Sequence, residues 1–157
     1  MGLLEEVFNS REFDIEDSVI IKFDDYFDER CREYNSFALD NVDIPILQHL
    51  VQLLSDNDCK IEIYVCTYGY AFENSQGVKL TYADCIWLDT TLTLSDVKKI
   101  ILESKVPEPS DISFIGDCME AERKKVWLVK QSIDGTPQVI EMCNQNHINK
   151  MLQLYWD

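Results

Sequence analysis

Cys143 and His147 are the most plausible reactive pair in this sequence. They are four residues apart, a spacing that places two side chains on one face of a helix. A Cys–His pair can supply a nucleophile with its base, or two ligands of a metal site. A polar cluster at the start of a helix explains the same two residues without any chemistry. Activation of the thiol would also need a lowered pKa, so we expect no catalytic role for this pair.

Other chemical motifs are missing from the sequence. The five glycines are dispersed, and they form neither a nucleophile elbow nor a phosphate-binding loop. The stretch that begins at Asp56 resembles the start of a calcium loop, but Ile61 and Thr67 stand where glycine and an acid are required. We therefore expect a protein that is not an enzyme and that holds no cofactor and no metal.

Asp84 lies in the middle of a β-type run, Tyr82-Ala83-Asp84-Cys85-Ile86-Trp87, where aspartate is disfavoured. One interpretation is an acid that faces a partner or an active site. The alternative is a charge on an edge strand that prevents aggregation. If Asp84 does face a partner, Tyr64 and Tyr68 belong to the same surface, because they occupy the same face of the predicted hairpin.

An acidic stretch between residues 24 and 34 is the strongest charge feature. Residues 1–60 hold 15 acids and 5 bases, so most of the chain's negative charge is in this part. We expect a helix over residues 24–34, where several acids would lie four residues apart and repel one another. Such a face is either simply solvated or a docking surface for a basic partner. The acids concerned are Asp24, Asp25, Asp28, Glu29 and Glu33.

The clearest β signal is a hairpin formed by residues 60–72 and 78–89 around a connection that contains Gly77. With the turn centred there, paired residue numbers sum to 150. The expected pairs are Ile63 with Trp87, Val65 with Cys85, Tyr64 with Ile86, Cys66 with Asp84, and Tyr68 with Tyr82. The first two pairs predict a core face that includes Trp87, and the other three predict a face that is either covered by a helix or open to a partner.

Further elements follow from apolar periodicity and turn residues. We expect helices over residues 3–8, 43–54 and from 95 to just before Pro107, and a last helix from Asn144 that carries Ile148, Met151, Leu152 and Tyr155. Strands are expected over residues 18–23 and 112–115, with a second hairpin at residues 125–130 and 138–142; an early helix start is the alternative for residues 18–23. The predicted fold class is α+β, with an antiparallel sheet built from two hairpins and about four helices packed on it.

Composition limits the class of protein. The chain of 157 residues has 29 acids, 14 bases and a net charge of −15, so we expect one acidic domain over residues 1–157 that binds neither nucleic acid nor membrane directly. The six cysteines form no close pairs, and we expect most of them to be buried, reduced packing residues. The start of the chain does not resemble a secretory signal. These features favour a cytoplasmic protein.

The functional hypothesis is an acidic binding protein that neutralises a basic protein partner, as immunity proteins and inhibitors do. The partner would be a toxin, a nuclease or another nucleic-acid-binding protein, attracted by charge and blocked at its active site. Two alternatives stay open at this point. One is a small enzyme whose site forms only in the fold, and the other is a homodimeric scaffold or subunit that uses the aromatic hairpin face as its contact.

Overall fold

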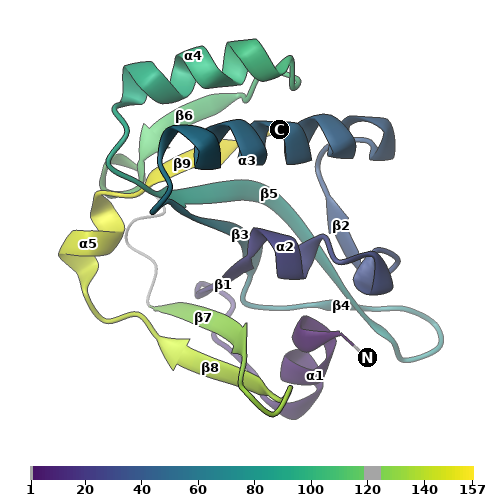
Figure 1. Ribbon diagram of the computed structural model, residues 1–157. Helices are drawn as coiled ribbons and strands as arrows, with labels where there is room; N and C mark the ends of the chain where they lie inside the picture. Colours follow the sequence, from purple (N-terminus) through teal and green to yellow (C-terminus); the bar gives the residue numbers. More distant parts are fainter. Residues whose placement is uncertain (1, 119–124) are drawn as a thin grey trace.

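The computed structural model describes residues 2–118 and 125–157 (Figure 1). The strands are β1 (Ser18–Lys22), β2 (Asn35–Phe37), β3 (Glu62–Tyr68), β4 (Phe72–Glu73), β5 (Lys79–Asp89), β6 (Asp111–Phe114), β7 (Val126–Gln131), β8 (Pro137–Glu141) and β9 (Leu152–Tyr155). The α-helices are α1 (Leu3–Ser10), α2 (Phe23–Tyr26), α3 (Ile44–Asn57), α4 (Leu94–Ser104) and α5 (Gln145–Asn149), and the 3₁₀ turns are η1 (Glu29–Cys31), η2 (Asn41–Asp43) and η3 (Ile115–Asp117).

All nine strands belong to one mixed sheet. Seven of them follow the order β6-β9-β5-β3-β1-β7-β8, and β2 and β4 pair with β5. Both expected hairpins, β3–β5 and β7–β8, are present. However, β1 lies between them and pairs in parallel with β7, and β2 pairs in parallel with β5. The predicted antiparallel sheet of two hairpins is therefore wrong, because long-range strand pairing decides the architecture and leaves no local sequence signal.

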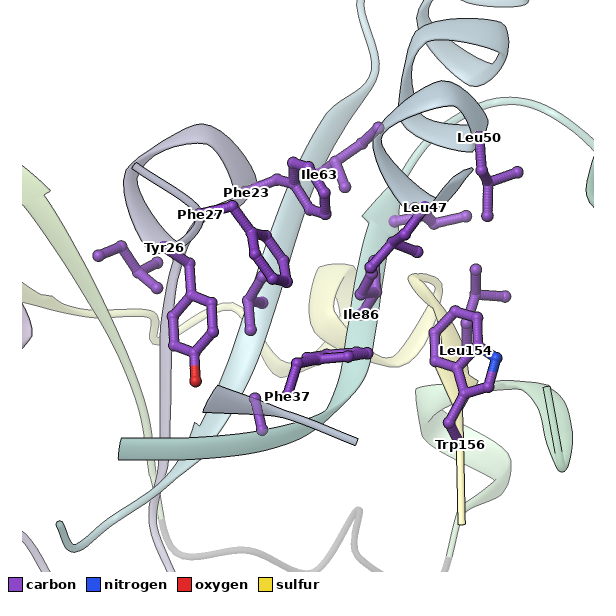
Figure 2. Close-up of a cluster of buried hydrophobic side chains, with 14 of the residues drawn as sticks. Phe23, Tyr26, Phe27, Phe37, Leu47, Leu50, Ile63, Ile86, Leu154 and Trp156 are labelled. Carbon is purple, nitrogen blue, oxygen red and sulfur yellow. The ribbon is translucent and has the colours of Figure 1, made fainter. Parts of the chain in front are cut away.

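The first face of the sheet carries the main core. Helices α1, α2, α3 and α4 contribute to this core. Figure 2 shows aromatic and aliphatic side chains of α2 and α3 packed against others from β2, β3, β5 and β9. Predicted helices α3 and α4 are confirmed, and α4 begins with a capping box in which Thr93 and Asp96 bond reciprocally.

The second face is covered by α5 and η3 over a smaller core. Its buried members are Ile20, Tyr64, Cys66, Cys85, Trp87, Ile115, Val126, Ile148 and Met151. Trp87 is 1% exposed, and its indole Nε1 donates to Gln153 Oε1 at 2.9 Å. Trp87 is a core residue as predicted, but it belongs to the face opposite Ile63 and Val65.

A register shift explains that error. From Glu62 to Cys66, paired residue numbers in β3 and β5 sum to 151, so Ile63 lies opposite Leu88, Tyr64 opposite Trp87, Val65 opposite Ile86 and Cys66 opposite Cys85. The next pair is Thr67 with Ala83, which leaves Asp84 as the extra residue of a β-bulge. The predicted register, in which paired numbers sum to 150, holds at Thr67 and Ala83. Nearer the turn, Phe72 pairs with Leu80 and Glu73 with Lys79, so the sum becomes 152.

The acidic stretch does not form the predicted helix. Helix α2 ends at Tyr26, and Asp28 has an extended backbone and caps the separate turn η1. Phe23, Tyr26 and Phe27 are buried in the first core, and the chain then turns so that β2 can lie beside β5. Tertiary packing of these aromatic residues therefore overrides the helical spacing of the acids.

The predicted last helix is also too long. Helix α5 spans only five residues, and the chain continues as β9 between β5 and β6. Met151, Leu152 and Tyr155 fit a helical stripe with Ile148, whereas Leu152 and Leu154 fit the alternation of a strand. Periodicity over so short a segment does not decide between the two.

The cysteines are less buried than predicted. Within residues 2–118 and 125–157, none of the six forms a disulfide, and Cys66 and Cys85 are buried, whereas Cys59 and Cys143 are exposed. Among the described residues, no helix reaches the length and apolar character that crossing a membrane requires.

Candidate functional site

The second face of the sheet carries an exposed group of tyrosines and carboxylates at one end. We call it the tyrosine–carboxylate cluster, and it consists of Tyr68, Tyr70, Tyr82, Asp84, Tyr155 and Asp157. Tyr68 lies in β3, Tyr82 and Asp84 in β5, and Tyr155 in β9. Tyr70 and Tyr82 are 41% and 36% exposed, so this part of the sheet is open to a partner.

Three tyrosine rings form a stacked row. The ring centroids of Tyr68 and Tyr70 are 5.5 Å apart with planes 18° from parallel, and those of Tyr68 and Tyr82 are 6.5 Å apart at 7°. Phe72 extends the row, with its ring at 85° to that of Tyr70 and with 53% of its surface exposed. This side of β5 continues into the β4–β5 hairpin, which projects from the sheet in Figure 1.

Asp84 is held by the bulge at a junction in the sheet. Its backbone oxygen accepts a hydrogen bond from Trp156 N at 2.9 Å, while the oxygen of Ala83 accepts one from Ala38 N at 2.9 Å. On this edge, β5 pairs with β2 up to Ala83 and with β9 from Cys85 onwards, so Asp84 lies where the neighbouring strand changes. The Asp84 side chain accepts from the Tyr68 hydroxyl at 2.7 Å and from the Cys85 thiol at 3.2 Å. The bulge therefore aims a fixed carboxylate along the row of rings.

Three tyrosines of the cluster, Tyr68, Tyr82 and Tyr155, have a raised pKa. Burial raises the pKa of Tyr68, and so do its hydrogen bond to Asp84 and the charge of that carboxylate. Burial and the charges of Asp84 and Asp157 raise the pKa of Tyr82. The Tyr155 hydroxyl donates to Asp157 Oδ1 at 3.5 Å. The cluster combines negative charge from carboxylates with neutral aromatic surface.

The cluster has no cation of its own in the described parts of the chain. Within residues 2–118 and 125–157, no lysine or arginine forms an ion pair with Asp84 or Asp157. Over the same residues, the rings that contact a cation are those of Phe13, Phe27 and Trp127. An acidic and aromatic surface of this kind can accept a positively charged group from outside.

Tyr64 lies apart from the cluster. It is 7% exposed in the core of the second face, and burial followed by the charges of Glu62 and Asp89 raises its pKa to about 12. Tyr68 and Asp84 are therefore brought together as the sequence predicted, but Tyr64 is not among the surface residues. Tyr70 could have been included from its position two residues after Tyr68, whereas Tyr155 could not, because its strand was predicted as a helix.

The acidic segment, which we define as residues 24–33, belongs to the other face of the sheet. Asp28 accepts three hydrogen bonds from Arg30, from the backbone N at 2.9 Å, Nε at 3.1 Å and Nη2 at 2.7 Å. These bonds lower the pKa of Asp28 to about 2. Asp24, Glu29 and Glu33 are exposed.

Asp25 lines a cleft of about 240 Å³ together with Glu6, Asp28, Arg30 and Cys31. Burial raises the pKa of the Asp25 carboxyl, Lys22 opposes this shift, and the charges of Asp24 and Asp28 add to it. Of the five acids in the segment, one is thus neutralised by a neighbour and one is partly withdrawn from solvent.

Cys143 and His147 each have a separate carboxylate partner. The Cys143 thiol lies 3.4 Å from Glu141 Oε2, and this hydrogen bond and charge raise the pKa of the thiol. His147 Nε2 lies 2.7 Å from Asp89 Oδ2, and Asn144 caps the helix by accepting from His147 N. This geometry favours the polar helix start over a nucleophile–base pair. In the described ranges, no group of three or more His, Cys, Asp or Glu side chains is arranged to hold a metal.

Comparison with known proteins adds no relative. No protein-family model, no curated protein and no solved structure matches this chain.

Proposed function

We propose that this chain is a non-enzymatic binding protein that neutralises a basic protein partner in the manner of an immunity protein or inhibitor. The observation that carries the proposal is the tyrosine–carboxylate cluster, a rigid acidic and aromatic surface that has no ion-pair partner for Asp84 or Asp157 within residues 2–118 and 125–157. Interfaces of this kind are anchored by aromatic side chains and by charge-assisted hydrogen bonds.

The two candidate surfaces take different parts in this proposal. The acidic segment and the net charge of −15 attract a basic partner over a distance. The cluster then provides the contact, because its groups are already held in place. A toxin, nuclease or other nucleic-acid-binding protein exposes the required lysines and arginines at its active site. Carboxylates that pair with these side chains occlude that site.

The same charge opposes direct binding to nucleic acid or to an anionic membrane. We place the function in the cytoplasm, where the six free cysteines stay reduced.

A photocrosslinker at the cluster tests the proposal. The chain is expressed in its native host cells with p-benzoylphenylalanine in place of Tyr70. The cells are irradiated, and the crosslinked proteins are identified by mass spectrometry. The matched control carries the same group in place of Leu102, which is 75% exposed on α4. We expect one basic protein to crosslink from position 70 and not from position 102, and its purified activity to be inhibited by the chain.

The proposal fails if the proteins captured from position 70 are acidic, or if the captured protein keeps full activity when saturated with the chain. Capture from both positions with equal yield also contradicts it, because it indicates a non-specific attraction to the negative surface.

A further inference from the structure

We propose that the tyrosine–carboxylate cluster is an arginine-binding site that takes the guanidinium group of one arginine side chain of the partner. This inference rests on the proposed function, and it specifies which chemical group the site recognises. It starts from the acceptors that Asp84 still offers. Within residues 2–118 and 125–157, one oxygen accepts from the Tyr68 hydroxyl at 2.7 Å, and the donor to the other is the Cys85 thiol, at 3.2 Å. Because a carboxylate offers about four lone-pair positions, Asp84 can accept further N–H groups.

The exposed rings favour a planar cation. A guanidinium group stacks on an aromatic face and donates two parallel hydrogen bonds to a carboxylate, whereas an ammonium group is a compact and strongly hydrated point charge. Tyr82 presents 36% of its surface next to Asp84. Burial and the charges of Asp84 and Asp157 both raise its pKa. The Tyr82 ring stacks on that of Tyr68, and the Tyr68 hydroxyl donates to Asp84 at 2.7 Å, so a guanidinium over Tyr82 lies close to a carboxylate.

Elsewhere in the described residues, two arginines and one lysine, Lys125 at 5.5 Å from the Trp127 ring centroid, lie over aromatic rings. The Arg11 guanidinium lies 4.7 Å from the ring centroids of both Phe13 and Trp127, and that of Arg32 lies 5.3 Å from Phe27. In the part of the chain that the structure describes, the tyrosines of the cluster have no such neighbour. The cluster is the aromatic surface that combines free ring area with a fixed carboxylate.

The site is held rigid before any ligand arrives. The bulge fixes Asp84, and stacking fixes Tyr68 between Tyr70 and Tyr82. Little side-chain entropy remains to be lost on binding, so a single side chain can bind measurably. A second copy of this chain is a poor occupant, because each copy carries a net charge of −15.

Two peptides of otherwise identical sequence test the inference. Each contains three glycines alternating with three basic residues, all arginine in one peptide and all lysine in the other. Both are titrated into the full chain carrying ¹³C-labelled tyrosine, and the ring resonances are followed by NMR. We expect the arginine peptide to bind about fivefold more tightly and to shift Tyr68 and Tyr82. Tyr64, buried on the same face, should not move and serves as the internal control.

Asp84→Asn removes the charge and keeps the shape and an acceptor for Tyr68. We expect it to weaken the arginine peptide about tenfold and to abolish the preference over lysine, with the Tyr64 resonance unchanged as proof of folding. Asp24→Asn is the matched control, since it removes the same charge from an exposed aspartate of the acidic segment. It should leave the preference intact.

Three results would overturn the inference. They are equal affinity for the two peptides, an equal loss of arginine affinity in Asp24→Asn and Asp84→Asn, and shifts of Tyr82 that depend on protein concentration without peptide, which indicate a second copy as occupant.

The failure of the proposed function is distinguishable from the failure of the arginine site. If arginine binds selectively but no basic protein crosslinks from position 70, only the proposed function is lost. If a basic protein is captured and inhibited but the peptides bind equally, only the arginine site is lost.

Discussion

The tyrosine–carboxylate cluster and the acidic segment carry the same kind of charged group, but the chain holds these groups in different ways. In the cluster, Asp84 is positioned by a β-bulge between paired strands and bonds to the hydroxyl of Tyr68. In the acidic segment, Asp28 closes a local turn and pairs with Arg30 two residues away. The Asp84 carboxylate accepts from a hydroxyl and a thiol, whereas that of Asp28 is paired with a guanidinium.

This difference shows that acids counted along a sequence overestimate the charge that a partner meets. Five acids lie between residues 24 and 33, yet Asp28 is paired and Asp25 lines a cleft. The cluster has fewer acids, but the part of the chain that the structure describes supplies no ion pair to Asp84 or Asp157. Position in the fold, and not local acid density, distinguishes the better candidate surface.

Removing Trp87 should have the largest effect, because its core supports the face that carries the cluster. Trp87→Ala should lower the free energy of unfolding by about 3–5 kcal/mol, and it also leaves Gln153 Oε1 without its indole donor. Denaturant unfolding measures the change, with Leu102→Ala on α4 as an exposed control expected to cost under about 0.5 kcal/mol. A Trp87→Ala variant that is as stable as the wild type would mean that the second face has no packed core.

Gly69 separates Tyr68 from Tyr70, and its substitution should disturb the cluster directly. A Cβ atom at Gly69 would lie 2.2 Å from the Asp14 carbonyl oxygen and 3.1 Å from that of Asp17. Gly69→Ala should therefore force a backbone shift that costs about 1–3 kcal/mol and changes the near-UV circular dichroism of the stacked tyrosines.

Ser75→Ala, in the exposed turn of the same hairpin, is the control, and both measurements should stay at the wild-type values. Unaltered tyrosine ellipticity in Gly69→Ala would show that the row is not held by this close backbone contact.

Tyr68→Phe tests the hydrogen bond that distinguishes the cluster. Loss of the bond to Asp84 should cost about 1 kcal/mol at neutral pH. The ordinary tyrosine pKa is 10.0, and the fold raises that of Tyr68. The unfolded chain therefore releases its proton first, and the stability due to the raised pKa is present below pH 10 and is lost as the pH rises above it.

Free energies of unfolding at pH 8 and pH 11 measure this dependence. The wild type should lose stability between the two, and Tyr68→Phe should lose less of it. Equal losses would contradict the assignment of the pKa shift to Tyr68.

Reversing charge in the acidic segment should have the smallest effect. Asp25→Lys combined with Glu29→Lys should slow association with the captured basic partner about two- to fivefold, and the difference should shrink at high salt. Asp84→Asn should instead speed dissociation, because it removes a contact. Association and dissociation rates at two salt concentrations separate the two surfaces. If the double variant also dissociates faster, the acidic segment is itself part of the interface.

The sequence predicts local elements well when their signals are local. Turn residues and alternation identify both hairpins, and the apolar stripe of Val97, Ile100 and Ile101 identifies α4. The cap at Thr93 precedes the predicted start of that helix at residue 95. Tyr68 and Asp84 were placed on one face and do meet. The bulge at Asp84 was not predicted, because one extra residue changes the register without changing the alternating pattern on either side of it.

Long-range pairing accounts for the larger errors. Nothing in residues 18–22 indicates that β1 will lie beside β7, since this pairing depends on segments distant in the chain. Tyr155 was missed for the same reason, because β9 becomes a strand only when it is paired on both sides. The helix predicted for the acidic stretch is wrong for a different reason, because here a local signal is present and is overridden. The acids do have helical spacing, but burial of Phe23, Tyr26 and Phe27 determines the backbone conformation.

The position of β9 has a consequence for how the chain folds during synthesis. Leu152–Tyr155 lies between β5 and β6, so β6 has no place in the sheet until residues near the end of the printed sequence have left the ribosome. Until then, residues 85–88 of β5 present unpaired backbone groups that can pair with another chain. A sheet in which β5 pairs with β3 before β9 has been synthesised has these four residues open at its edge. Closure then joins segments far apart in the chain, which is a slow step, and aggregation of the nascent chain competes with it.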